Sequence, residues 1–95
     1  NLQYGITIDK LSLLRNYTFY RYNEELVHPF YISDSGYKMR STNKIKLEGD
    51  GSPTEGINGI QFFTLEFNGL TTDNTLLYFC TTHPEMVKEF KLVNN

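Results

Sequence analysis

Short stretches of alternating apolar and polar residues dominate this chain and leave little room for helices. The clearest is the run IQFFTLEF at positions 60–67, in which Phe63, Leu65 and Phe67 fall on one face. This two-residue period is typical of a half-buried β-strand. By contrast, no stretch longer than about two turns keeps the 3.6-residue apolar stripe of an amphipathic helix. The sequence therefore predicts an all-β protein.

The same signals predict further strands at residues 5–8, 17–22, 28–33, 44–47, 75–80 and 88–93. Turn-forming residues separate them at positions 23–25, 34–36 and 68–69. The longest irregular stretch, residues 48–59, holds four of the seven glycines and is therefore expected to be a loop. Seven to eight short strands with frequent turns favour an antiparallel β-sandwich, and 95 residues are enough for one domain, residues 1–95.

The charge and hydropathy of the chain exclude several classes of partner. Its formal net charge is −2 and its pI is near 5.6, whereas a nucleic-acid-binding protein needs a basic footprint. The longest unbroken apolar run, residues 76–80, is far too short to span a bilayer, so we expect no membrane contact from this segment. No signal peptide is present, and a chain that begins at Asn1 is interpreted as a mature form or an excised domain.

Both histidines, the single cysteine and one of the two methionines gather in two places. His28 begins one expected strand, and the run CTTHPEM at positions 80–86 lies between two others. A lone cysteine forms no internal disulfide, so it is either a small buried side chain or a reactive or metal-ligating thiol. One thiolate, two imidazoles and a weak axial thioether are the ligand set of a type 1 copper centre, whereas zinc gains little from a thioether. We therefore expect one copper ion bound by His28, Cys80, His83 and Met86.

The run CTTHPEM resembles the ligand loop of amicyanin-type cupredoxins, with Cys, His and Met at Cys-x2-His-x2-Met and a proline after the histidine. Plastocyanin-like proteins are similar but have a longer gap before the methionine. The aromatic strand upstream, the HPFYI segment and the last apolar strand also resemble cupredoxin domains, in the same order over most of the chain. The resemblance implies a Greek-key β-sandwich whose single copper ion carries electrons between transient protein partners. It further implies a monomeric, non-enzymatic protein located outside the cytoplasm.

The sequence departs from the family pattern beside two of the ligands. Many cupredoxins have an asparagine after the first histidine, whose backbone N–H donates to the cysteine sulfur, but Pro29 has no N–H. Amicyanin-like loops have a proline two residues after the cysteine, where this chain has Thr82. We therefore expect the Thr82 N–H to donate to the thiolate instead. Phe79 stands where plastocyanins have a tyrosine, which favours the edge of His83 as the place of electron exchange.

Other interpretations of the same residues are open at this point. The four ligands could hold Cu(I) for storage or delivery, or the fold could be a copper-free interaction module. A nucleophile made of Cys80 and His83 is the enzyme alternative, but the chain is small for a substrate cleft and has no oxyanion-hole signature. Asn16-Tyr17-Thr18 is a glycosylation sequon beside an expected strand.

Overall fold

The computed structural model describes residues 9–21 and 28–95, and every regular element within them is a β-strand. The strands are β1 Lys10–Ser12, β2 Tyr17–Tyr20, β3 Phe30–Ser33, β4 Ile45–Gly49, β5 Phe62–Phe67, β6 Leu77–Cys80, β7 His83–Glu89 and β8 Lys91–Val93. The prediction of an all-β protein is confirmed for this part of the chain. Within it there is also no helix of the length and apolar character that crossing a bilayer requires.

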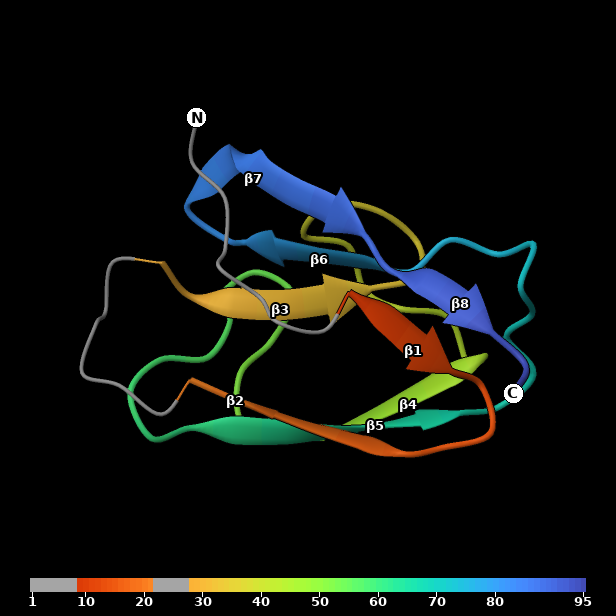
Figure 1. Cartoon of the computed structure of the whole chain (residues 1–95). Helices are drawn as coiled ribbons and strands as arrows, with labels where there is room; N and C mark the ends of the chain where they lie inside the picture. The colour runs from red at the N-terminus through yellow and green to blue at the C-terminus, as the bar shows by residue number, and fades with distance from the viewer. Residues whose placement is uncertain (1–8, 22–27) are drawn as a thin grey trace.

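The strands form two antiparallel sheets and one parallel pair. Sheet β2-β5-β4 and sheet β3-β6-β7 each contain three strands, and β1 pairs with β8 in parallel. Figure 1 shows the sheet β3-β6-β7 above the sheet β2-β5-β4, with the β1–β8 pair beside them. The parallel pair differs from the expected wholly antiparallel arrangement, and β1 was not predicted. A three-residue strand is too short to show a two-residue period, and its partner lies at the far end of the chain.

Aromatic side chains fill the space between the two antiparallel sheets. Phe63 of β5 is fully buried, and its ring lies 4.6 Å from that of Tyr31 on β3 and 5.4 Å from that of Phe19 on β2. Phe19 in turn lies 5.7 Å from Phe30 of β3, measured between ring centroids. Such contacts bury apolar surface from both sheets at once. The aromatic core therefore holds β3 against the opposite sheet. β3 begins two residues after His28 and pairs with β6, which ends at Cys80.

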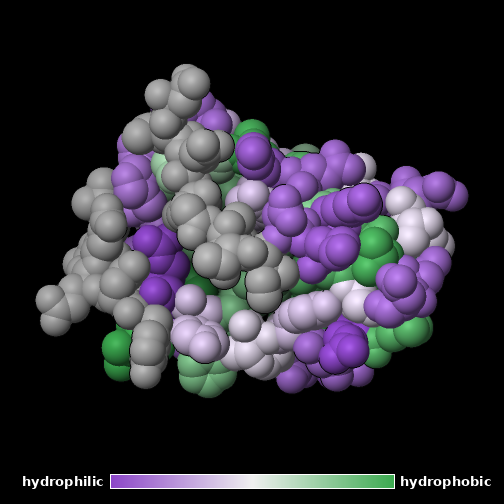
Figure 2. Space-filling model, viewed as in Figure 1, coloured by the Kyte–Doolittle hydropathy of each residue, from purple (hydrophilic) through white to green (hydrophobic). Residues whose placement is uncertain are grey.

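The alternation seen in the sequence at β5 is confirmed. Phe63 and Leu65 are buried, whereas Phe62 and Glu66 face outward. Near the C-terminus, Phe90 and Leu92 are likewise buried while Glu89 and Lys91 are exposed, as predicted. On the face shown in Figure 2, polar residues predominate over the described part of the surface, with apolar residues scattered among them. Most of the large apolar side chains in the described residues are thus buried or partly buried.

Several predicted strand boundaries are wrong by a few residues. β3 begins at Phe30 rather than 28, β5 at Phe62 rather than 60, and β6 at Leu77 rather than 75. The predicted strand at 88–93 is in fact the end of β7 and all of β8, which are separated at Phe90. Hydrogen bonding to a partner strand decides where a strand starts, and the apolar pattern does not contain that information.

Two predicted loops are only partly irregular in the structure. The stretch 48–59 is a loop from Asp50 onward, but Ile57 within it is fully buried and forms an isolated bridge with Phe30. The run after Cys80 is not wholly a loop, because β7 already begins at His83. The expected strand at 5–8, the turn at 23–25 and the last position of the expected strand 17–22 lie outside the described residues.

Candidate metal centre

Three of the predicted ligands lie together in the structure. The Cys80 Sγ is 3.7 Å from Nδ1 of His28 and 3.4 Å from Nδ1 of His83. The two imidazole rings are 4.7 Å apart between centroids. One ligand atom from each of the three residues lies within 4.8 Å of the others, a spacing that could hold a metal ion. The structure therefore confirms that His28, far back in the sequence, folds onto the Cys80–His83 run.

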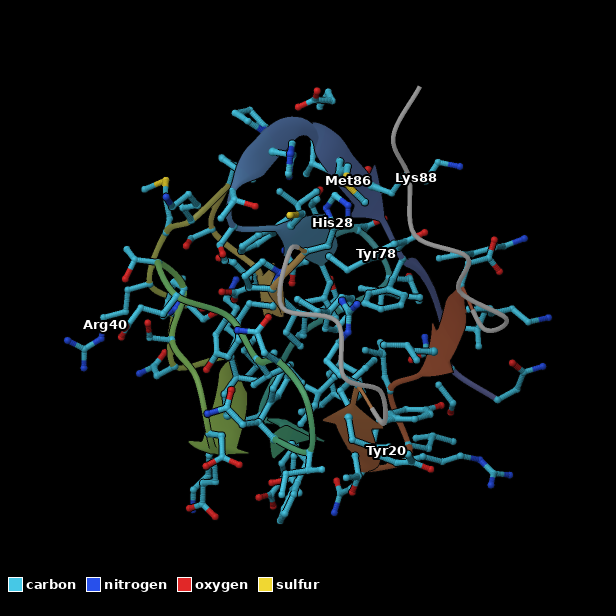
Figure 3. The ribbon with its side chains drawn as sticks, turned by 90° about the vertical axis from the view of Figure 1, so that its left-hand side faces the viewer. Tyr20, His28, Arg40, Tyr78, Met86 and Lys88 are labelled. Atoms are coloured by element: carbon cyan, nitrogen blue, oxygen red, sulfur yellow. The ribbon has the colours of Figure 1, made fainter. Side chains whose placement is uncertain are left out.

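Backbone pairing in the sheet β3-β6-β7 explains this approach. Cys80 is the last residue of β6 and lies opposite Phe30, so His28 stands two residues beyond the paired position. On the other side of β6, Phe79 lies opposite Val87 but Cys80 lies opposite His83. Residues 84–86 are therefore inserted between these two pairs, in the arch at the top of Figure 3. The register of β6 with both neighbours brings the thiol and the two imidazoles to one end of this sheet.

The distances match those between ligands that share one ion. A metal about 2.3 Å from a thiolate and about 2.0–2.1 Å from an imidazole nitrogen separates sulfur from nitrogen by about 3.6–3.8 Å, at angles between tetrahedral and trigonal. The two sulfur–nitrogen distances, 3.7 and 3.4 Å, lie within a few tenths of an ångström of that range. The cluster could accept an ion with only small movements of the side chains.

The surroundings of Cys80 favour its thiolate form. The side chain is fully buried, and burial by itself raises the pKa of a thiol. Hydrogen bonds from Thr82, His83 and His28 outweigh burial and lower the pKa of Cys80 from its ordinary 9.0 to about 6. The Thr82 hydroxyl lies 3.2 Å from Sγ, and the Thr82 backbone N–H also donates to the sulfur. The predicted backbone hydrogen bond from Thr82 is thus confirmed, whereas its hydroxyl was not foreseen.

This low pKa predicts how pH affects the stability of the metal-free protein. In the folded protein the Cys80 thiol has a pKa of about 6, whereas in the unfolded chain it has its ordinary pKa of 9.0. Between these values the unfolded chain carries the extra proton, so stability increases with pH. The thiolate's contribution is complete above pH 9.0 and is lost progressively as pH falls to about 6. The difference between the urea midpoints of wild type and Cys80→Ser should therefore change in favour of Cys80→Ser as pH falls across this window. A constant difference between the two would contradict the lowered pKa.

Met86, the fourth predicted ligand, lies on β7 and is 5 % exposed. It belongs to the inserted segment 84–86. The register puts Met86 at the end of the sheet β3-β6-β7 that carries Cys80 and His83, and Figure 3 labels it beside the arch of β7. The structure therefore places this thioether in the interior, at the end of the sheet where Cys80 and His83 lie. Its role as an axial ligand stays a prediction.

Two side chains that the sequence does not single out hold the backbone of candidate ligand residues. Nη1 of Arg21 donates to the carbonyl oxygen of His28 at 2.5 Å, and the hydroxyl of Tyr37 donates to the carbonyl oxygen of Cys80 at 2.7 Å. These partners are 7 and 43 residues apart in the chain. No spacing rule connects residues at such separations, so only the folded structure could have identified them.

The loop before β5 supports the His28 side of the cluster. Gly56 has a φ of +67°, and a Cβ added there would lie 2.8 Å from the Cβ of Pro29. The neighbouring Ile57 exchanges backbone hydrogen bonds with Phe30, at 3.1 and 2.8 Å. A left-handed conformation and a close approach both require glycine at this position. The loop thus packs directly against the residue that follows His28.

The fold and the site define a class: an all-β protein, in its described part, with a candidate metal centre of one thiolate and two imidazoles. Comparison with protein-family models, with curated proteins and with solved structures gave no significant match. The chemistry of His28, Cys80 and His83 themselves therefore indicates the function.

Proposed function

We propose that this chain is a type 1 copper protein that carries single electrons between redox partners. The observation that carries the proposal is the buried Cys80 thiol with one nitrogen of each imidazole close to its sulfur, at 3.7 and 3.4 Å. A thiolate with two imidazoles in one plane is the equatorial ligand set of blue-copper sites. His28, Cys80 and His83 would hold the ion, and Met86 would add a weak thioether donor. When bound, copper would supply a reversible one-electron couple between Cu(I) and Cu(II).

The chain itself supports this function by limiting movement of the ligands. Cys80 and His83 are paired across β6 and β7, and the backbone next to His28 is bonded to Thr81, whose N–H donates to the Pro29 carbonyl at 3.0 Å. Ligands held by the backbone change position little when the charge of the ion changes, which favours fast electron exchange. The partly exposed His83 is the proposed point of electron exchange.

The proposal includes the finer features of the fold and setting that the cupredoxin resemblance implies. These are a Greek-key β-sandwich, one domain over residues 1–95, a monomeric state, transient docking to a redox protein and a location outside the cytoplasm. The two facing antiparallel sheets with an aromatic core are compatible with such a sandwich. Docking of electron carriers is usually weak and buries little surface, so no large apolar interface is needed.

A titration of the purified chain with Cu(II) tests the proposal. One equivalent should produce the intense visible absorption of a thiolate–Cu(II) bond, together with the small copper hyperfine splitting of a type 1 centre in the EPR spectrum. Saturation without this absorption would show ordinary Cu(II) binding and would contradict the proposal. No binding at all would favour the copper-free interaction module.

Two other candidate functions use the same residues. A protein for copper storage or delivery would hold Cu(I) without a fast redox cycle, so a reversible couple with rapid self-exchange favours the electron carrier. A cysteine nucleophile would need access to a substrate, and the Cys80 side chain is 0 % exposed. Its burial supports a ligand rather than a nucleophile, and we propose no enzymatic activity.

Replacing the proposed axial ligand should change the redox potential and leave the fold intact. Met86→Leu conserves volume, so it should cost less than about 1.5 kcal/mol of stability. The visible absorption should persist, because the thiolate stays in place, while the reduction potential should rise on loss of the weak thioether donor. Voltammetry measures this shift. Met39→Leu is the matched control, since Met39 is 54 % exposed, and it should leave the potential unchanged. Equal potentials for both variants would remove Met86 from the ligand set.

A further inference from the structure

The peptide unit between Cys80 and Thr81 is held at both of its ends. Its carbonyl oxygen accepts a hydrogen bond of 2.7 Å from the Tyr37 hydroxyl. Its N–H donates to the Pro29 carbonyl oxygen at 3.0 Å. A peptide unit is planar, so fixing both groups fixes the orientation of the whole plane. One plane therefore links the cysteine to the residue that follows His28 and to a tyrosine far away in the chain.

Tyr37 is itself fixed in place. Its ring meets that of Phe79 edge to face, with centroids 5.1 Å apart and planes at 66°. The loop that carries it is closed by Asp34, whose carboxylate accepts from the Thr42 backbone N–H at 2.8 Å, and by a hydrogen bond from the Ser35 hydroxyl to the Arg40 carbonyl oxygen. A hydroxyl held by its own ring and loop can orient the group to which it donates, because its position is set in advance.

The orientation of this peptide plane determines where the groups that surround the cysteine sulfur lie. A rotation of the plane would change ψ of Cys80 and the direction of the backbone that follows. That backbone includes Thr82, whose N–H and hydroxyl both contact Sγ, and His83, whose Nδ1 lies 3.4 Å from it. The hydrogen bond from Tyr37 thus acts on the surroundings of the sulfur through the main chain.

We propose that Tyr37 is a positioning residue of the metal centre. By donating to the Cys80 carbonyl, its hydroxyl orients the peptide unit that sets His83, and the Pro29 backbone next to His28, against the thiolate. The inference rests on the proposed copper function. The two hydrogen bonds that hold the Cys80–Thr81 peptide unit, here called the clamp, are present in the metal-free chain and can be tested there.

The test is Tyr37→Phe, which removes the hydroxyl and keeps the ring on Phe79. Tyr17→Phe is the matched control, because the Tyr17 hydroxyl also bonds to the backbone, accepting from the Ser12 N–H at 2.8 Å, but belongs to the other sheet. In the metal-free protein, Tyr37→Phe should speed amide hydrogen exchange of Thr81 about fivefold, the effect of losing one typical hydrogen bond. Exchange at Ile32, within β3, serves as the internal reference. Tyr17→Phe should leave the Thr81 rate unchanged relative to this reference.

The copper-loaded variants give a second measurement. Tyr37→Phe should shift the thiolate–copper absorption or change its intensity, whereas Tyr17→Phe should reproduce the wild-type spectrum. If both variants match wild type in exchange at Thr81 and in the spectrum, Tyr37 has no positioning role. If the wild-type chain binds no copper, the proposed function fails, and faster Thr81 exchange in Tyr37→Phe alone would still establish the clamp. Unchanged exchange in that case would overturn the clamp as well.

Discussion

Cys80→Ser is expected to abolish the intense visible absorption of the copper-loaded protein and to weaken copper binding by more than about 100-fold. Outer-shell partners of metal ligands are already worth about 10- to 100-fold in affinity, and Cys80 is proposed as the only anionic ligand. A serine hydroxyl does not ionise near neutral pH and offers a hard oxygen in place of a soft sulfur. Absorption spectra and a competition titration with a copper chelator measure the two effects.

The fold of Cys80→Ser should survive, because serine is nearly the same size and Thr82 and His83 can hydrogen-bond its hydroxyl. Circular dichroism and a cooperative urea transition would verify that the loss of colour is chemical rather than structural. Any remaining Cu(II) should give the wide hyperfine splitting of an ordinary site. A variant that stays intensely coloured would show that copper binds elsewhere, and the assignment of this centre would be wrong.

Phe63→Ala is expected to have the largest effect on stability. The side chain is fully buried, and its ring contacts those of Phe19, Phe30 and Tyr31 from two different sheets. Truncating such a phenylalanine costs about 3–5 kcal/mol, from lost burial and from the cavity that is left. A domain of this size has about 5–15 kcal/mol in total, so a large share of its stability would be lost. The urea or thermal midpoint measures the change.

Phe62→Ala is the matched control for this prediction. Phe62 is the preceding residue on β5, is 50 % exposed and lies opposite Tyr20 on β2. Losing this cross-strand pair should cost less than about 1 kcal/mol. Similar losses for both variants would mean that the aromatic contacts at Phe63 do not hold the two sheets together.

The sequence predicted which segments form strands better than it predicted where those strands begin and end. Strand identity was predictable at β5 because burial alternates with a period of two, which is a local property. Strand limits were not, since they depend on the partner's hydrogen bonds, as at His28 and Pro29, which precede β3. β1 was missed because its parallel partner β8 lies at the opposite end of the described chain.

The chemical types of the candidate ligands were evident from the sequence alone, because only Cys80, two histidines and two methionines offer soft or borderline donors. The spacing of Cys80 and His83 is also local, so their proximity could be expected.

Tertiary structure alone decided which distant residues meet Cys80. The pairing of Phe30 with Cys80 brings His28 to the thiol across 52 residues, and Tyr37 reaches the Cys80 carbonyl across 43. Neither separation has a periodic signature, because such contacts depend on which strands become neighbours in the sheets. The sequence thus specified which donor groups are present, and the register of β3 and β6 decided that a histidine and a cysteine would meet.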